Sequence, residues 1–120
     1  MPHALIIEDQ FLIATTIADE LRECGYDTAD IAVSEEEAIQ FAESSCPDLI
    51  TVDQRLASGS GISAIRHICR DRAIPVIWVT GVATEVRNIV SDAVILEKPF
   101  SHQALCRAVQ DAVLNARVYS

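Results

Sequence analysis

The feature that most constrains the fold of this chain is an alternation, repeated five times, of short apolar runs with segments of helical periodicity. The apolar runs cover residues 4–8, 28–33, 48–53, 76–80 and 94–97. The helical segments cover about residues 10–24, 35–43, 62–72, 84–90 and 102–118. Because a helix follows each strand, we predict an α/β fold in which a five-stranded parallel sheet has helices on both faces. Right-handed crossovers leave few topologies, and we choose the doubly wound (βα)5 order 2-1-3-4-5.

Local signals support these boundaries. Ser34 followed by Glu37 forms a capping box, and Ser101 is expected to cap the last helix. Gly25 is a candidate left-handed residue after the first helix. The run 28–33 is more polar than the others and is expected at a sheet edge. The inner face of the last helix is predicted to carry Leu105, Ala108, Val109, Ala112 and Val113.

Length and composition fit a single compact domain. The chain has 120 residues, of which 50% are apolar and 22% charged, without a linker of low complexity. We predict one domain over residues 1–120 and no output domain, since the last predicted helix ends two residues before the end of the sequence.

The charge and the apolar runs exclude several classes of partner. A formal net charge of −9 repels phosphate backbones, which argues against direct binding of nucleic acid and favours a cation or a basic partner. The apolar runs are too short to cross a bilayer, and the first residues lack the features of a signal peptide. We therefore expect a cytoplasmic protein that does not bind membranes.

The cysteines and histidines do not suggest a second site. Cys24, Cys46, Cys69 and Cys106 form no CxxC pair and have no histidine at the spacing of metal ligands, so we interpret them as small buried apolar residues. The three histidines, which we expect to be ordinary surface or boundary residues, are His3, His67 and His102.

Polar residues follow the apolar strands at their carboxyl ends. Glu8 and Asp9 follow the first strand, Asp53 ends the third, Thr80 ends the fourth and Lys98 follows the fifth. In a parallel sheet these ends share one edge, and strands 1 and 3 are neighbours in the chosen order. Three carboxylates so close together need a cation, and an all-oxygen site open to water suits Mg²⁺.

The same edge can also bind an anion. Lys98 supplies an ammonium group, and its bond to Pro99 is one at which a cis peptide is accessible. Thr80 supplies a hydroxyl, and the loops after strands 3 and 4 supply backbone N–H groups. The predicted site is therefore a phosphoryl-binding pocket around Asp53.

These residues match a known pattern. The segments are LIIEDQ with Glu8 and Asp9, LITVDQRL with Asp53, IWVTG with Thr80, and the KPF triplet that begins at Lys98. Over essentially its whole length the chain resembles the receiver domain of two-component response regulators, which has the CheY-like, flavodoxin-like fold.

The resemblance implies a role for each residue. Asp53 would accept a phosphoryl group from a histidine kinase or a histidine phosphotransfer protein. Mg²⁺ would be held by Asp9 directly, by Glu8 through water, by Asp53, and by the backbone carbonyl of Arg55. Thr80 and Lys98 would bind the phosphoryl oxygens and couple phosphorylation to the binding of a downstream effector. Such a domain is no enzyme beyond its own phosphotransfer and self-dephosphorylation.

Three features depart from the usual pattern. Ile95 stands where many receivers carry an aromatic switch residue, the interval from Thr80 to Lys98 is short, and the loop after Asp53 reads QRLASGSG. The first puts an aromatic switch in doubt, and the other two suggest an altered fourth helix. Together with the sequence WVTG at residues 78–81, they resemble receivers with a Phe-Ala-Thr-Gly type motif in strand 4, including those of general stress response regulators.

The first helix opens on more apolar residues than one inward face needs. One hypothesis is that Phe11, Leu12 and Thr15 form part of a docking patch for a helical phosphodonor. The alternative is that they serve core packing alone.

The residues also allow a comparison of the receiver with other classes of function. A degenerate receiver that acts by protein contact without phosphorylation is the alternative that the residues leave open. An aspartyl phosphatase needs a second aspartate two residues after its nucleophile, where this chain has Arg55. The sequence after the first strand is unlike the phosphate loop of a flavodoxin, and no P-loop is present. A homodimer is left open, as is the choice between a phosphate shuttle, a phosphate sink and an effector-binding role.

Overall fold

The computed structural model describes residues 2–119 and has the predicted topology. Five parallel strands lie in the order β2-β1-β3-β4-β5. The strands are β1 (His3–Ile7), β2 (Thr28–Ala32), β3 (Leu49–Val52), β4 (Val76–Thr80) and β5 (Ile95–Glu97). The helices are α1 (Phe11–Glu23), α2 (Glu35–Ser44), α3 (Gly61–Ile68), α4 (Ala83–Ile89) and α5 (His102–Leu114). The polar strand β2 is at an edge, as its composition predicted.

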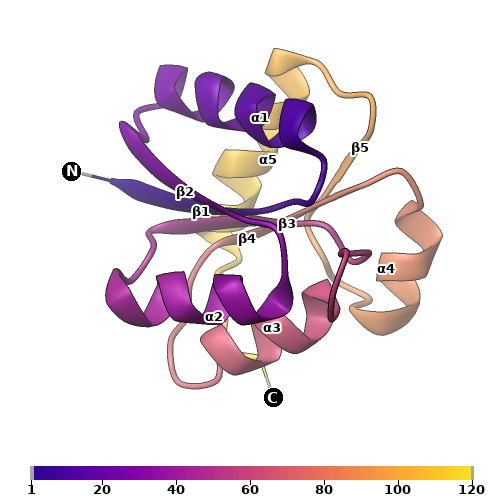
Figure 1. Cartoon of the computed structure of the whole chain (residues 1–120). Helices are drawn as coiled ribbons and strands as arrows, with labels where there is room; N and C mark the ends of the chain where they lie inside the picture. The colour runs from indigo at the N-terminus through magenta and orange to yellow at the C-terminus, as the bar shows by residue number, and fades with distance from the viewer. Residues whose placement is uncertain (1, 120) are drawn as a thin grey trace.

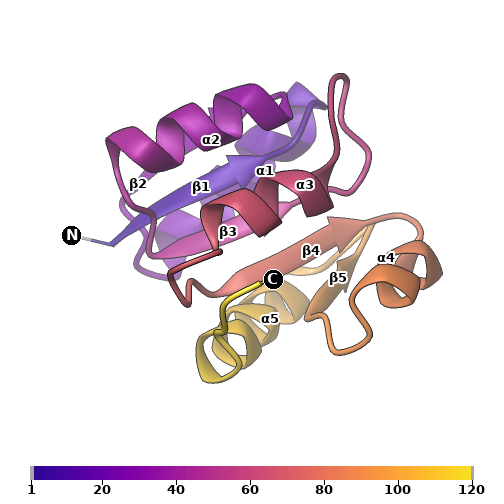
Figure 2. The same ribbon diagram turned by 90° about the horizontal axis from the view of Figure 1, so that it is seen from below.

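Helices cover both faces of the sheet. Helices α1 and α5 lie on one face, and α2, α3 and α4 lie on the other (Figures 1 and 2). Successive residues of β1 contribute to opposite faces: Leu5 packs with the α2–α3–α4 side, and Ile6 packs with the α1–α5 side. Since both sides are covered, the central strands are continuous apolar runs.

The helix ends follow the local signals. The Ser34 hydroxyl accepts a hydrogen bond from the Glu37 N–H, and the Ser101 hydroxyl accepts one from the Ala104 N–H. Gly25 adopts a φ of +99° directly after α1, a conformation that other L-residues rarely take. These short-range contacts explain why most boundaries were predictable, although α3 ends at Ile68 instead of residue 72.

The end of the chain differs from the prediction. Helix α5 ends at Leu114 instead of residue 118, and the chain turns back toward the start of β4. There the Tyr119 N–H donates a hydrogen bond to the Cys69 carbonyl at 2.9 Å, and the Tyr119 side chain is buried in the α2–α3–α4 core. Because the helix ends early, the tail can bury Tyr119 against the core. No local pattern in the sequence predicts this contact.

The prediction that Val113 faces the core is wrong. Its side chain is 51% exposed, whereas Leu105, Ala108, Val109 and Ala112 are buried as predicted. Those four residues already complete the stripe that faces the sheet, and Val113 lies about 100° further around the helix than Ala112.

The prediction for the cysteines holds only for Cys69, which is buried. Cys46 is exposed because it lies in the α2–β3 connection, and Cys24 and Cys106 are half-buried. None of the helices within residues 2–119 is long and apolar enough to cross a membrane.

Candidate functional site

The carboxyl edge of the sheet brings the predicted site residues together. Ile7 pairs with Val52 across β1 and β3, and the Asp53 N–H donates a hydrogen bond to the Ile7 carbonyl at 3.0 Å. Asp53 therefore follows β3 next to the point where Glu8 follows β1. On the other side of β4, the Lys98 N–H donates to the Thr80 carbonyl at 2.9 Å. The strand order and register thus place these residues at one edge.

Lys98 bridges two of the carboxylates. Its Nζ lies 2.8 Å from Glu8 Oε1 and 2.8 Å from Asp53 Oδ2. Glu8 is 1% exposed, whereas the side chains of Lys98 and Asp53 are 17% and 13% exposed. The Lys98–Pro99 peptide bond is cis. Asp53 is thus the carboxylate of this pair that a partner can reach, while Glu8 lies beneath it.

The pKa values of Glu8 and Lys98 follow from this arrangement. Burial raises the pKa of Glu8 above its ordinary value and outweighs the opposing effects of Lys98 and the Gln10 N–H. Burial acts to lower the pKa of Lys98, but the hydrogen bond to Asp53 and the one to Glu8 outweigh it and raise that pKa. Lys98 therefore stays positive at neutral pH.

Further polar groups lie at the same edge of the sheet as Asp53. The Thr80 hydroxyl oxygen accepts a hydrogen bond from the Val82 N–H at 3.0 Å, so its proton can be donated to another acceptor. The Arg55 N–H donates to Asp53 Oδ1 at 3.3 Å. Asp9 is exposed at the end of β1. The predicted members of the site thus include both buried and accessible groups.

The loop after Asp53 is folded back on itself. Arg55 and Ser60 form an isolated antiparallel bridge, and Gly59 between them has a φ of +81°. Gly61 packs so closely on the backbone carbonyl of Asp53 that a Cβ atom would collide with it. The two glycines of the sequence QRLASGSG are therefore required by a turn and by a close backbone approach.

The side chain of Arg55 forms a contact that the sequence did not reveal. Its guanidinium is 75% exposed and pairs with Glu85 of α4, with Nη2 2.7 Å and Nε 3.1 Å from Oε2. The hydrogen bond to Glu85 raises the pKa of Arg55 above its ordinary value. Thirty positions separate the two residues, and no local pattern links them. The pair connects the loop after Asp53 to the short seven-residue helix α4.

The acidic residues fit a hard divalent cation. Glu8 Oε1 is buried, and the Lys98 ammonium lies 2.8 Å from it. This carboxylate oxygen has a second lone pair that could accept a hydrogen bond from a water held by a metal ion. Glu8, Asp9, Asp53 and the Arg55 carbonyl supply only oxygen donors, which is the set that Mg²⁺ prefers. The residue types at this edge of the sheet therefore fit Mg²⁺.

An apolar groove adjoins the acidic site. It has a volume of about 460 Å³ and is lined by Leu12, Ile13, Thr16, Glu20, Lys98, Pro99 and Phe100. Phe11 and Leu12 are 71% and 79% exposed, so both are free for contact. Thr15 is half-buried and donates its hydroxyl proton to the Leu12 carbonyl. Among the three residues of the predicted patch, Leu12 lines the groove, and Thr16 is a lining residue outside that predicted patch.

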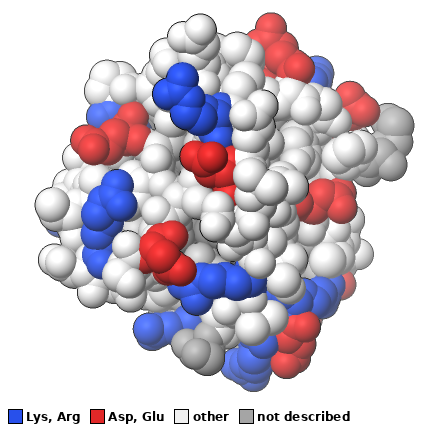
Figure 3. All heavy atoms as spheres, turned by 180° about the vertical axis from the view of Figure 1, so that it is seen from behind, with Lys and Arg blue, Asp and Glu red and all other residues white. Residues whose placement is uncertain are grey.

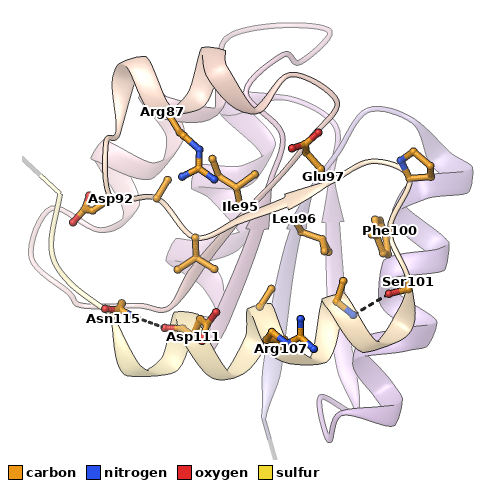
Figure 4. Close-up of a pocket in the computed structure, with 15 residues that line it drawn as sticks. Arg87, Asp92, Ile95, Leu96, Glu97, Phe100, Ser101, Arg107, Asp111 and Asn115 are labelled. Atoms are coloured by element: carbon orange, nitrogen blue, oxygen red, sulfur yellow. Dashed lines mark hydrogen bonds between the residues drawn. The ribbon is translucent and has the colours of Figure 1, made fainter.

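A second hollow lies between α4, β5 and α5. Its volume is about 760 Å³, and Arg87 of α4 and Arg107 of α5 lie on either side of β5, with Ile95 and Glu97 between them (Figure 4). Ile95 is half-buried and lines this hollow. It stands at the position where many receivers carry an aromatic switch residue. Figure 3 shows the face of the molecule behind the view of Figure 1, where blue and red side chains alternate without forming one large patch.

A family model for the response regulator receiver domain matches residues 4–110. The chain belongs to this family. The match contains all the predicted phosphoryl-site residues, and the strand order is that of the CheY-like receiver fold. Receivers are signalling modules of two-component systems, so the general function of the chain follows from the family.

Known receivers resemble this one over most of its length. The transcriptional regulatory protein PdtaR of Mycobacterium tuberculosis is 35% identical over 94% of this chain, which spans 57% of that protein. The phyllosphere-induced regulator PhyR of Methylorubrum extorquens is 31% identical over 91% of this chain, which spans 42% of that protein. The receiver domain of a sensor histidine kinase from Pseudomonas aeruginosa is 27% identical, with a TM-score of 0.79, and holds a magnesium ion coordinated in its active site cleft. That match covers 95% of this chain and 98% of that one.

Proposed function

We propose that this receiver accepts a phosphoryl group on Asp53 in a Mg²⁺-dependent reaction and thereby changes which partner it binds. The donor is a phosphohistidine of a histidine kinase or of a histidine phosphotransfer protein. The observation that carries the proposal is the position of Asp53, an accessible carboxylate with an ammonium 2.8 Å from Oδ2 and a backbone N–H 3.3 Å from Oδ1.

The residues present account for the chemistry. An Asp53 oxygen forms a bond to phosphorus as the P–N bond to the donor imidazole breaks, which leaves an acyl phosphate on Asp53. Lys98 offsets negative charge on the transferring oxygens, and the Thr80 hydroxyl donates a proton toward one of them. Mg²⁺ held by Glu8, Asp9, Asp53 and the Arg55 carbonyl supplies further neutralisation of that charge. The domain catalyses no reaction beyond this transfer and the hydrolysis of its own acyl phosphate.

Formation of the acyl phosphate also changes the contacts of Lys98. The ammonium shares its charge between Glu8 and Asp53 in the unphosphorylated site. A phosphoryl group on Asp53 carries more negative charge and more acceptor oxygens than the carboxylate, so it competes for Lys98 and for Thr80. Both residues flank the β4–β5 side of the sheet, and the hollow between α4, β5 and α5 is the proposed site for an effector.

The donor is proposed to dock on α1. Phe11 and Leu12 are large, exposed apolar residues, and Leu12 lines a groove that also contains Lys98. A helix packed on this patch, which includes Thr15, would bring its phosphohistidine to the acidic site. We expect Leu12→Ala to slow phosphotransfer from the donor protein and to leave phosphorylation by a small molecule unchanged. Equal rates of transfer from the donor protein to the wild type and to Leu12→Ala would disprove this docking surface.

Several features of the whole protein are also proposed. A net charge of −9 supports partners other than nucleic acid or membranes and fits a cytoplasmic domain, and a homodimer is consistent with the same surfaces. The short helix α4 and the sequence WVTG at residues 78–81 support placement in the subgroup with a Phe-Ala-Thr-Gly type motif. Since the chain spans about half of its curated relatives, these proposals concern the receiver domain itself.

Ile95 favours one second candidate function. It replaces the aromatic switch residue, so a receiver that binds its partner without phosphorylation is the alternative. The deciding experiment is intact-protein mass spectrometry after incubation with a small-molecule phosphodonor, with and without Mg²⁺. We expect one Mg²⁺-dependent phosphoryl adduct on the wild type and on Asp71→Asn, an exposed control, and none on Asp53→Asn. Circular dichroism checks that the variants are folded. A wild type without adduct supports the alternative.

A further inference from the structure

Three potential metal ligands meet outside the acidic site. Cys24 follows α1, and His102 and Cys106 lie on the first turns of α5. Their ligand atoms all lie within 4.8 Å of one another. The Sγ atoms of Cys24 and Cys106 are 3.2 Å apart, and His102 Nε2 is 3.3 Å from Cys106 Sγ.

This cluster corrects the expectation that no histidine has the spacing of a metal ligand. His102 and Cys106 are four positions apart on a helix and therefore share one face. Cys24 lies 82 positions away from Cys106, and only the packing of α1 and α5 on the same face of the sheet unites them (Figure 1). The interpretation of His102 as an ordinary surface residue is likewise incomplete.

The imidazole of His102 is oriented for coordination. Its Nδ1 lies 3.4 Å from Glu20 Oε1 and 3.7 Å from Glu23 Oε2 on α1. With the proton on Nδ1 facing these carboxylates, the lone pair of Nε2 is available on the side where the Cys106 sulfur lies 3.3 Å away. A carboxylate behind a histidine ligand is a common arrangement at metal sites, where it orients the ring and increases its basicity. Glu20 Oε2 is buried without a hydrogen-bond partner among the residues that the structure describes.

The ligand set selects the kind of metal. Two sulfur ligands and an imidazole suit Zn²⁺ and exclude Mg²⁺, which prefers oxygen. Tetrahedral Zn–S and Zn–N bonds of about 2.3 and 2.0 Å put ligand atoms about 3.5–3.8 Å apart. The Sγ–Sγ distance of 3.2 Å is about 0.6 Å shorter than this and the Cys106 Sγ–His102 Nε2 distance of 3.3 Å about 0.2 Å shorter, while all three ligand atoms lie within 4.8 Å of one another. Half-exposed side chains can accommodate such a change. The imidazole is partly exposed, so water can reach the fourth position.

We propose that Cys24, His102 and Cys106 bind Zn²⁺ and thereby tie the end of α1 to the beginning of α5. Both thiol protons leave to solvent as the thiolates coordinate the ion, and water takes the fourth position. Because α5 begins just after Lys98, Pro99 and Phe100, the bound ion restrains the segment that carries the proposed phosphoryl-site lysine. This binding does not depend on phosphorylation of Asp53.

The test is a Co²⁺ titration of the reduced, metal-free chain with excess Mg²⁺ to occupy the acidic site. We expect one Co²⁺ to bind per chain, with thiolate-to-cobalt charge-transfer bands and the visible bands of a tetrahedral ion. Both sets of bands should disappear on addition of Zn²⁺. Cys24→Ser, Cys106→Ser and His102→Asn should each weaken binding by more than about 100-fold, and Glu20→Gln by about 10-fold. Cys46→Ser is the matched control, since Cys46 is exposed and lies outside the cluster.

Each outcome decides the proposal. Binding in the wild type and in Cys46→Ser that is lost in the three ligand variants supports the site, provided that circular dichroism shows the variants folded. If a cysteine variant fails to fold, His102→Asn and Glu20→Gln still discriminate. The proposal is overturned by a reduced wild type that binds no Co²⁺, by spectra without thiolate bands, or by full binding in the ligand variants. A reduced chain that binds no metal but loses two thiols per chain in air, in the wild type and in Cys46→Ser but not in Cys24→Ser, would overturn the proposal and identify Cys24 and Cys106 as a redox pair instead.

Discussion

At the scale of single residues, Lys98 balances the charge of the acidic site. It pairs with Glu8 and Asp53 at 2.8 Å each, so its removal leaves two neighbouring carboxylates without their cation. Removing one partner of a fully buried pair costs about 3–5 kcal/mol, and the partial exposure of Lys98 reduces that value. The site therefore depends on this one side chain when no metal ion is bound.

We expect Lys98→Ala to lower the free energy of unfolding by about 1–3 kcal/mol without Mg²⁺. Mg²⁺ should stabilise the variant more than the wild type, because the cation replaces the lost ammonium. Urea denaturation with and without Mg²⁺ measures both effects. Arg22→Ala, which removes an exposed pair with Asp19, is the control and should cost no more than about 1 kcal/mol. A Lys98→Ala protein as stable as the wild type would contradict this charge balance.

Gly61 controls the backbone beneath Asp53. A Cβ at this position would collide with the Asp53 carbonyl, so Gly61→Ala has to displace the loop that carries the candidate phosphoacceptor. We expect a loss of about 1–3 kcal/mol in the free energy of unfolding and slower phosphorylation by a small-molecule donor. Gly81→Ala is the matched control for stability, since a Cβ there meets nothing within 4 Å. A Gly61→Ala protein that is phosphorylated as fast as the wild type would refute this role.

At the scale of elements, the tail after α5 closes one side of the core. Tyr119 is buried beside α3 and β4, and its N–H binds the Cys69 carbonyl. Burial raises the pKa of the Tyr119 phenol above its ordinary value of 10.0. A group with a raised pKa in the folded state contributes stability that is present below pH 10.0 and is lost as the pH rises through the folded-state pKa.

We therefore expect Tyr119→Phe to lose less stability than the wild type between about pH 8 and about pH 11. The variant has no phenol to ionise, whereas Tyr26, Cys69 and Lys98, whose pKa values are also raised, titrate in both proteins. Denaturant unfolding at the two pH values measures the difference. Identical losses in both proteins would show that the Tyr119 phenol does not contribute to alkaline unfolding.

At the scale of the whole molecule, one sheet joins two apolar layers. Trp78 belongs to the layer under α2, α3 and α4, and Leu105 belongs to the layer under α1 and α5. Each central strand contributes side chains to both layers, so neither can unfold without disrupting the other. The molecule should unfold as one unit.

We expect Leu105→Ala to lower the free energy of unfolding by about 2–5 kcal/mol. The unfolding midpoint from Trp78 fluorescence should fall together with the midpoint from far-UV circular dichroism, although Trp78 lies on the other side of the sheet. Leu114→Ala is the control because Leu114 is 82% exposed, and its midpoint should change little. Separate midpoints for the two signals in Leu105→Ala would show that the layers unfold independently.

The sequence by itself determined the sheet order, the layers and most helix ends. Apolar periodicity depends on nearby residues, and caps such as Ser34 and Ser101 act within one turn. Once a parallel order was chosen, the polar residues after each strand had to share one edge. The sequence therefore predicts that Glu8, Asp53, Thr80 and Lys98 are neighbours.

Only the tertiary structure decided which side chains touch. The position of Lys98 between Glu8 and Asp53, the pair of Arg55 with Glu85, the cluster of Cys24 with His102 and Cys106, and the return of Tyr119 all join distant segments. Such contacts depend on how helices pack and on the paths of loops, which local patterns do not encode. The sequence thus determined which elements form and where their ends meet, whereas the packing of those elements selected the contacts between them.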